Sequence, residues 1–136
     1  MSDLEQVVAV ERLCHEHPWS PELFQRELAN PISTIDLFWF GESLAGFLCS
    51  WVVGGELEIL DVATAPAFRR RGVAAALMRH VFVRARRQGI ESAFLEVRIG
   101  NTGAIDLYHR FGFSVVGRRS RYYADGEDAL LMQRRE

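Results

Sequence analysis

The ten residues Phe68–Leu77, FRRRGVAAAL, place three arginines before a glycine and a run of small and aliphatic residues. A glycine where a helix begins directly after a strand lets the backbone approach an anion closely, because free N–H groups and the positive end of the helix dipole point at it. Short glycine motifs also occur at ordinary turns beside solvated arginines. The stretch therefore predicts either a phosphate-binding helix start or a basic surface patch.

The whole chain has the size and composition of one compact domain, residues 1–136. Its 136 residues are 49% hydrophobic and 25% charged, which are ordinary values for a soluble protein. No segment resembles a transmembrane span or a signal peptide, so we expect a cytoplasmic protein that does not bind membranes. The net charge of −2 argues against a surface devoted to nucleic acid.

The cysteines and histidines do not suggest a metal site. Cys14 and Cys49 are widely spaced in apolar surroundings, which predicts buried free thiols. The four histidines are His15, His17, His80 and His109. We find no ligand spacing between them and carboxylates or thiols, so no metal is expected.

Local patterns predict two helices, three strands, a helix, a strand, a helix and two strands. Helices are expected up to about residue 15, from Ser20 to about Ala29, over Gly72–Gln88 and over Asn101–Phe111. Strands are expected over Ser33–Phe40, Leu44–Val53, Glu56–Thr64, Ala93–Ile99, Phe113–Arg119 and Asp128–Gln133. The helix beginning at Gly72 requires a right-handed crossover between parallel strands. The predicted fold class is α/β, a mixed sheet with helices on both faces.

Several motifs resemble those of one enzyme superfamily. Arg69–Ala74, RRRGVA, resembles the pyrophosphate-binding signature of the GNAT N-acetyltransferases, Arg or Gln, two residues, Gly, one residue, Gly or Ala. It is neither a Rossmann nor a Walker motif. Further segments are similar to the bacterial ribosomal-protein-alanine N-acetyltransferases, the RimI group, over almost the full length. These segments are HPWS at 17–20, LEVR at 95–98, NTGAIDLY at 101–108, RYY at 121–123 and EDA at 127–129.

The resemblance implies the GNAT fold, with a mostly antiparallel sheet in which one parallel pair splays apart. The strand Leu57–Thr64 would diverge from Ala93–Ile99, and its unpaired backbone groups would bind the pantetheine arm of acetyl-CoA. The residues implied in acetyl-CoA binding are Val62, Ala63, Thr64, Arg69, Arg70, Arg71, Gly72, Val73, Ala74, Ala75 and Asn101. Asn101 also suits a helix cap, and the two roles can coexist.

Glu96 is the candidate general base. It is a carboxylate within an otherwise apolar strand, a costly arrangement unless the group is paired or functional. The residues alone slightly favour a structural ion pair with Arg98 on the same face. The resemblance implies that Glu96 removes a proton from the acceptor amine through water.

Tyr108 is the candidate general acid. It belongs to the inward face of the helix over Asn101–Phe111, so helical spacing alone predicts a core aromatic. The resemblance implies that its phenol protonates the departing CoA sulfur. Trp19, Tyr122 and Tyr123 are expected to border the acceptor-peptide groove, and ordinary packing remains open for each.

These expectations together predict an acetyl-CoA-dependent N-terminal acetyltransferase. The resemblance implies direct transfer in a ternary complex, without metal, to the N-terminal alanine of a small-subunit ribosomal protein. Acetylation of lysines or small-molecule amines is the alternative enzymatic interpretation. A non-catalytic acyl-CoA sensor and an RNA-binding module are the alternatives from other classes of protein.

Overall fold

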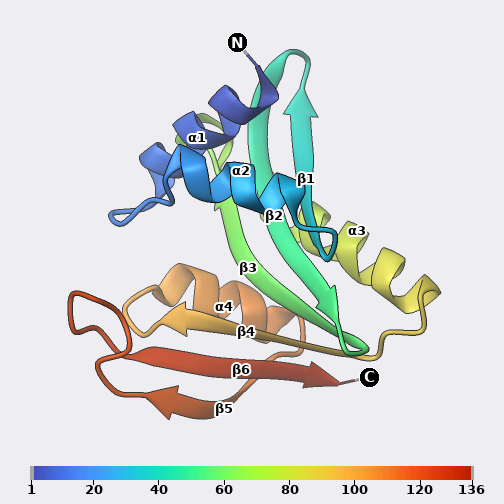
Figure 1. Ribbon diagram of the computed structural model, residues 1–136, viewed down its shortest axis with the longest axis vertical. Helices are drawn as coiled ribbons and strands as arrows, with labels where there is room; N and C mark the ends of the chain where they lie inside the picture. The colour runs from blue at the N-terminus through green and yellow to red at the C-terminus, as the bar shows by residue number, and fades with distance from the viewer. Residues whose placement is uncertain (1, 136) are drawn as a thin grey trace.

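A computed structural model describes residues 2–135 as a six-stranded mixed sheet with helices on both faces (Figure 1). The helices are α1 (Asp3–Cys14), α2 (Pro21–Ala29), α3 (Val73–Arg87) and α4 (Thr102–Arg110), with a 3-10 turn at Pro66–Phe68. The strands are β1 (Ser33–Phe40), β2 (Ser43–Val53), β3 (Glu56–Thr64), β4 (Ser92–Arg98), β5 (Ser114–Arg119) and β6 (Ala129–Arg135). The predicted elements and fold class are confirmed, and the 3-10 turn is an addition.

Side-chain caps explain where three of the helices begin. Ser2 Oγ accepts a hydrogen bond from the Glu5 amide at 3.2 Å, and Ser20 Oγ accepts one from the Leu23 amide at 3.2 Å. Asn101 Oδ1 accepts from the Ala104 amide at 3.3 Å. Each cap satisfies an amide that has no partner within its own helix, so the capping signals place these helix starts correctly. None of the helices over residues 2–135 is long and apolar enough to cross a bilayer.

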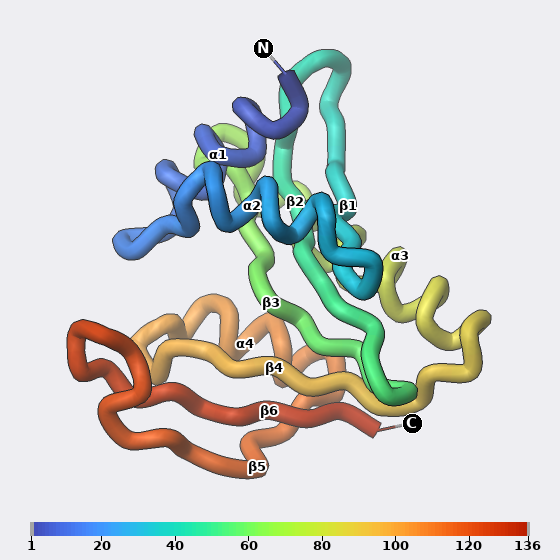
Figure 2. Tube along the Cα trace, in the orientation of Figure 1, coloured from blue at the N-terminus to red at the C-terminus, as the bar shows by residue number. Residues whose placement is uncertain are grey.

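The strand order is β1-β2-β3-β4-β6-β5, and only β3 and β4 are parallel. Their pairing runs from Glu56 opposite Ser92 to Ile59 opposite Leu95 and stops there, although both strands continue. Figure 2 shows the two traces separating from this point. The predicted splay is therefore present, and it leaves backbone groups of both strands unpaired within the sheet.

A bulge in β3 lies directly after the splay begins. Cys49 of β2 is opposite Asp61, whereas the next residue of β2, Ser50, is opposite Ile59, so Leu60 is an extra residue. A bulge reverses the alternation of side chains along a strand. Ile59 packs into the core beneath α3 and α4, whereas Ala63 packs into the core beneath α1 and α2. The bulge thus also turns Asp61 toward α1.

Two apolar clusters hold the helices on the sheet. The larger lies beneath α3 and α4 and includes Leu48, Met78 and Leu95, all almost fully buried. The smaller lies between α1, α2 and the sheet, and Phe24 of α2 makes an edge contact there with Phe47 of β2. Because helices cover both faces, the splayed strands open between two packed layers.

Candidate active site

A cleft of about 540 Å³ lies where β3 and β4 separate. Its walls come from α1 and the segment after it, from β3 and β4 beyond their last pair, from the start of α4 and from the loop before β6. Six of the residues predicted for the site line it: Trp19, Val62, Glu96, Asn101, Tyr108 and Tyr123. Segments far apart in the sequence therefore meet at one opening in the sheet.

Glu96 follows Leu95, the last residue of β4 that pairs with β3. Its side chain is 22% exposed, and its Oε1 lies 3.7 Å from Nη2 of Arg119. The alternative interpretation, an ion pair with Arg98, is wrong. Arg98 Nη1 instead donates to Asp125 and Glu127, each at 3.0 Å. The Glu96 carboxylate therefore lines the cleft and has a long contact with the mostly exposed guanidinium of Arg119.

The carboxyl group of Glu58, on β3, lies close enough to Glu96 for their charges to interact. Burial, followed by the negative charge of Glu96, raises the pKa of Glu58. Sequence reasoning did not single out Glu58, because its proximity to Glu96 depends on the pairing of β3 with β4. Of these two carboxyl groups, Glu96 lines the cleft and Glu58 is not among the lining residues.

Tyr108 lies on α4 and is almost fully buried, with its ring 5.9 Å from that of Phe113. It also lines the cleft, so it is both a core aromatic and a cleft residue. Burial, followed by the negative charge of Asp61, raises the pKa of Tyr108. The phenol therefore stays protonated at neutral pH and can donate a proton.

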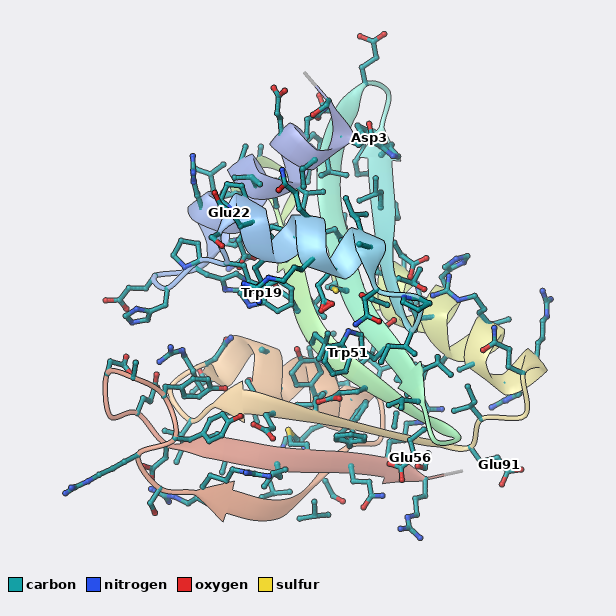
Figure 3. The ribbon with its side chains drawn as sticks, in the orientation of Figure 1. Asp3, Trp19, Glu22, Trp51, Glu56 and Glu91 are labelled. Atoms are coloured by element: carbon teal, nitrogen blue, oxygen red, sulfur yellow. The ribbon has the colours of Figure 1, made fainter. Side chains whose placement is uncertain are left out.

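The three predicted acceptor-groove residues lie in different surroundings. The Trp19 ring is 5.3 Å from that of Phe24 and packs against the smaller apolar cluster, and Figure 3 shows Trp19 next to α2. Tyr123 is half-buried, with the Arg98 guanidinium 3.9 Å from its ring centroid. Tyr122 is exposed and is not among the residues that line the cleft. A hydrogen bond to Glu96 raises the pKa of Tyr122, so this ring lies at the rim beside Glu96.

The start of α3 has the backbone shape that an anion site requires. Gly72 is the N-cap with φ of 74°, a left-handed conformation that favours glycine, and it brings no side chain to the first-turn amides. Arg70 also has a positive φ, 64°. The predicted residues 69–75 are not among those that line the cleft, and lie beyond the carboxyl end of β3.

The three arginines before α3 are all exposed, and two of them also contact other parts of the chain. The guanidinium of Arg71 lies over the rings of Phe40 and Phe68, at 5.8 and 5.7 Å from their centroids. The Arg69 side chain interacts with the thiol of Cys14. Arg69 and Arg71 thus contact other segments, and the N-cap residue Gly72 offers the first-turn amides no side-chain cap.

The two cysteines differ. Cys49 is fully buried, as predicted, and burial raises its pKa to about 12. The same prediction for Cys14 is wrong, since Cys14 is half-buried and lines the cleft.

The end of β3 that β4 leaves unpaired contains Val62, Ala63 and Thr64, of which Val62 lines the cleft. A hydrogen bond from Cys14 to Thr64 connects α1 to this strand end.

Sequence reasoning missed a cluster formed by Glu11, His15 and Asp61. The histidines were expected to have no ligand spacing with carboxylates, but Glu11 and His15 are one helical turn apart and Asp61 completes the group. Burial, followed by a hydrogen bond with Asp61, raises the pKa of Glu11 to about 9. The helical spacing was visible in the sequence, whereas the approach of Asp61 was not.

Comparisons with known proteins agree with this geometry. The sequence model of the Acetyltransferase (GNAT) family matches residues 4–113. The chain is 32% identical to a ribosomal protein bS18-alanine N-acetyltransferase of Escherichia coli (strain K12), over 96% of this chain and 90% of that protein. It is 36% identical to the N-alpha-acetyltransferase RimI of Mycobacterium tuberculosis, over 88% of this chain and 77% of that protein.

One solved structure shows the same architecture over nearly the whole chain. The crystal structure of the ribosomal-protein-S18-alanine N-acetyltransferase from Escherichia coli superposes with a TM-score of 0.90 at 30% identity. The match covers 98% of this chain and 87% of that one.

Proposed function

The chain belongs to the GNAT family of acetyltransferases, and we propose that it transfers an acetyl group from acetyl-CoA to the N-terminal amine, foremost alanine, of a small-subunit ribosomal protein. The observation that carries this proposal is that Glu96 and Tyr108 line the same cleft at the splay of β3 and β4. Its relatives named as ribosomal-protein-alanine N-acetyltransferases support the choice of acceptor. Such an acceptor would place the reaction in the cytoplasm.

Acetyl-CoA supplies the acetyl group as an activated thioester, and the chain has features that fit each part of it. The end of β3, Val62–Thr64, has backbone groups that β4 leaves unpaired, which suits the amide-rich pantetheine arm. The uncapped first-turn amides after Gly72 suit the diphosphate, because they carry the positive end of the α3 dipole. Asn101, which lines the cleft, is placed to contact the arm while it caps α4.

Glu96 accepts a proton from the acceptor amine, directly or through one water. An α-amine with a pKa near 8 is about one-tenth neutral at pH 7, whereas a lysine amine near 10.4 is neutral in well under one part in a thousand. A carboxylate of ordinary basicity is therefore enough for an N-terminal acceptor. This chemistry favours an α-amine over a lysine side chain as the substrate.

Tyr108 gives its proton to the CoA sulfur as the thiolate leaves the acetyl carbon. Its raised pKa keeps the phenol neutral, so the donor is in the correct state before the reaction begins. The bond from the acetyl carbon to sulfur breaks as the bond to nitrogen forms, and the protein itself is not acetylated. Direct transfer of this kind needs both substrates in the cleft together.

The acceptor chain would enter beside Trp19 and Tyr123, with Tyr122 at the rim. These rings offer apolar surface and polar edges at the mouth of the cleft, a combination that is common where peptides bind. A short side chain at the first acceptor position suits a cleft in which Tyr108 is already packed against the core.

The test is product analysis by mass spectrometry. Three acceptors would be compared: the N-terminal peptide of the bacterial small-subunit protein bS18 beginning with alanine, the same peptide with a blocked α-amine and an added lysine, and an aminoglycoside. We expect acetylation of the first peptide alone, at its α-amine. Activity confined to the lysine peptide or the aminoglycoside would refute the proposed acceptor while leaving the enzyme class intact.

A further inference from the structure

Two buried carboxyl groups and one imidazole meet at a wall of the cleft. Glu11 of α1 is 1% exposed, and Asp61, which the β3 bulge turns toward α1, is 9% exposed. His15 follows Glu11 by one helical turn, and its side chain is 27% exposed. Glu11, His15 and Asp61 all line the cleft, so the group borders the space proposed for the acceptor.

Each carboxyl group accepts a hydrogen bond through one oxygen and none through the other. Glu11 Oε2 accepts from the Trp19 amide at 2.9 Å, and Asp61 Oδ1 accepts from His15 Nε2 at 3.0 Å. Within residues 2–135, Glu11 Oε1 and Asp61 Oδ2 are buried and accept no hydrogen bond. Two buried carboxyl groups that lie together repel each other unless a proton or a cation neutralises part of their charge. The two neighbouring carboxyl groups therefore favour the binding of a cation between them.

The donor atoms are spaced as ligands of one small cation. One atom from each residue can be chosen so that all lie within 4.8 Å of one another. His15 Nε2 lies 3.4 Å from Glu11 Oε1 and 3.0 Å from Asp61 Oδ1. In a tetrahedral zinc site with bonds of roughly 2.0–2.1 Å, neighbouring donors are about 3.3 Å apart. The two separations from His15 match that edge within a few tenths of an ångström, and the separation between the two carboxylates is no more than 4.8 Å.

We propose that Glu11, His15 and Asp61 form a binding site for a divalent zinc-like cation, with a fourth coordination position open to the cleft. Two carboxylates and one imidazole are a donor set that zinc accepts, with three protein ligands and one exchangeable position. Magnesium and calcium prefer more oxygen donors and a larger shell. The two carboxylates also cancel the charge of the ion, so the occupied site is neutral.

A cation at this site would change the charge of the cleft wall formed by Glu11, His15 and Asp61, which borders the space proposed for the acceptor. The negative charge of Asp61 is one of the causes that raise the pKa of Tyr108. A bound cation would cancel that charge, and its open position would face the cleft. The acetyl transfer proposed above does not need the ion, so the cation site and the proposed function can fail independently.

Isothermal titration with zinc chloride, after removal of metals with a chelator, tests the site. We expect one zinc ion per chain in the wild type. Asp61→Asn and His15→Ala each remove a ligand and should weaken binding by more than the ~10-fold that loss of a supporting contact costs. Cys14→Ser and Glu16→Gln are the matched controls, because both residues line the same cleft outside the cluster, and both variants should bind as the wild type does.

Circular dichroism melts would accompany each titration to show that the variants are folded. His15 is the most exposed ligand, so His15→Ala keeps the test decisive if Asp61→Asn fails to fold. The absence of saturable zinc binding by the wild type would overturn the proposal. Equal binding by wild type and His15→Ala, or loss of binding in Cys14→Ser alone, would overturn it as well.

Discussion

The thiol of Cys14 donates a hydrogen bond to the backbone carbonyl of Thr64, with a sulfur-to-oxygen distance of 3.0 Å. Cys14 ends α1, and Thr64 ends β3 at the strand edge proposed to bind acetyl-CoA. The bond therefore places a reactive atom of α1 beside the proposed cofactor site.

Thiol labelling should distinguish the two cysteines. Cys49 is fully buried and its pKa is raised to about 12, so iodoacetamide should not modify it in the folded protein. Cys14 should react slowly, because burial raises its pKa too, and CoA should slow it further. Mass spectrometry of the labelled protein measures both rates. If saturating CoA leaves the rate at Cys14 unchanged, the end of β3 is not where the cofactor binds.

Substitution of the proposed acid and base should lower turnover without abolishing cofactor binding. Glu96→Gln and Tyr108→Phe should each reduce kcat by roughly 10²–10⁴-fold, the usual contribution of acid–base catalysis. The KM for acetyl-CoA should change little. Glu91→Gln is the control, since Glu91 is an exposed carboxylate just before β4 (Figure 3). Wild-type turnover in both site variants would show that the assigned roles are wrong.

The glycine at the start of α3 should matter more than the arginines. A Cβ on Gly72 would meet nothing within 4 Å, so the cost of Gly72→Val is strain in the left-handed backbone rather than a clash with the protein. That strain, roughly 1–2 kcal/mol, is relieved by moving the first-turn amides. The valine side chain would also occupy the space proposed for the diphosphate, so acetyl-CoA binding, measured by calorimetry, should be abolished by Gly72→Val and only weakened by Arg70→Ala.

A matched control for Gly72 exists at the turn between β2 and β3. Gly54 has φ of 59° and equally open surroundings, so Gly54→Val introduces the same kind of strain at the opposite end of β3 from the segment that leads into α3. We expect Gly54→Val to lower the melting temperature while acetyl-CoA still binds. If both variants bind alike, the start of α3 is only a surface turn.

Alkaline pH should destabilise the protein through its tyrosines. The chain has three tyrosines, and the pKa of each is raised, chiefly by burial at Tyr108 and Tyr123 and by Glu96 at Tyr122. A folded pKa above the unfolded value near 10 gives stability that is complete below pH ~10 and is lost as pH rises through the folded pKa. Melting temperatures across this range should fall, and less steeply in Tyr108→Phe. If the melting temperature of Tyr108→Phe falls with pH as steeply as that of the wild type, ionisation of Tyr108 does not contribute to the loss of stability.

Arg98 should control acceptor binding through the loop before β6. Its guanidinium holds Asp125 and Glu127 and stacks on Tyr123, and Glu127 Oε2 also accepts from the Gly100 amide at 2.9 Å. Arg98→Met should release the loop and raise the KM for the acceptor peptide several-fold, with a smaller effect on acetyl-CoA binding. Arg110→Met, on the surface of α4, serves as the control. An unchanged peptide KM would separate this loop from the acceptor groove.

The sequence alone determined the order and limits of the helices and strands, because caps, turn glycines and side-chain periodicity act within a few residues of one another. The resemblance of its motifs to the GNAT N-acetyltransferases also pointed to the splay of β3 from β4, to Gly72 at an anion-binding helix start, and to Glu96 and Tyr108 as residues of one site.

Only the tertiary structure decided which side chains meet. Arg98 lies two residues from Glu96 in sequence but binds Asp125 and Glu127, because the loop before β6 returns over β4. Asp61 reaches Glu11 and His15 because one extra residue at Leu60 turns it toward α1. Such contacts join segments some 30 to 50 residues apart, and their register depends on strand pairing and bulges that no local pattern encodes.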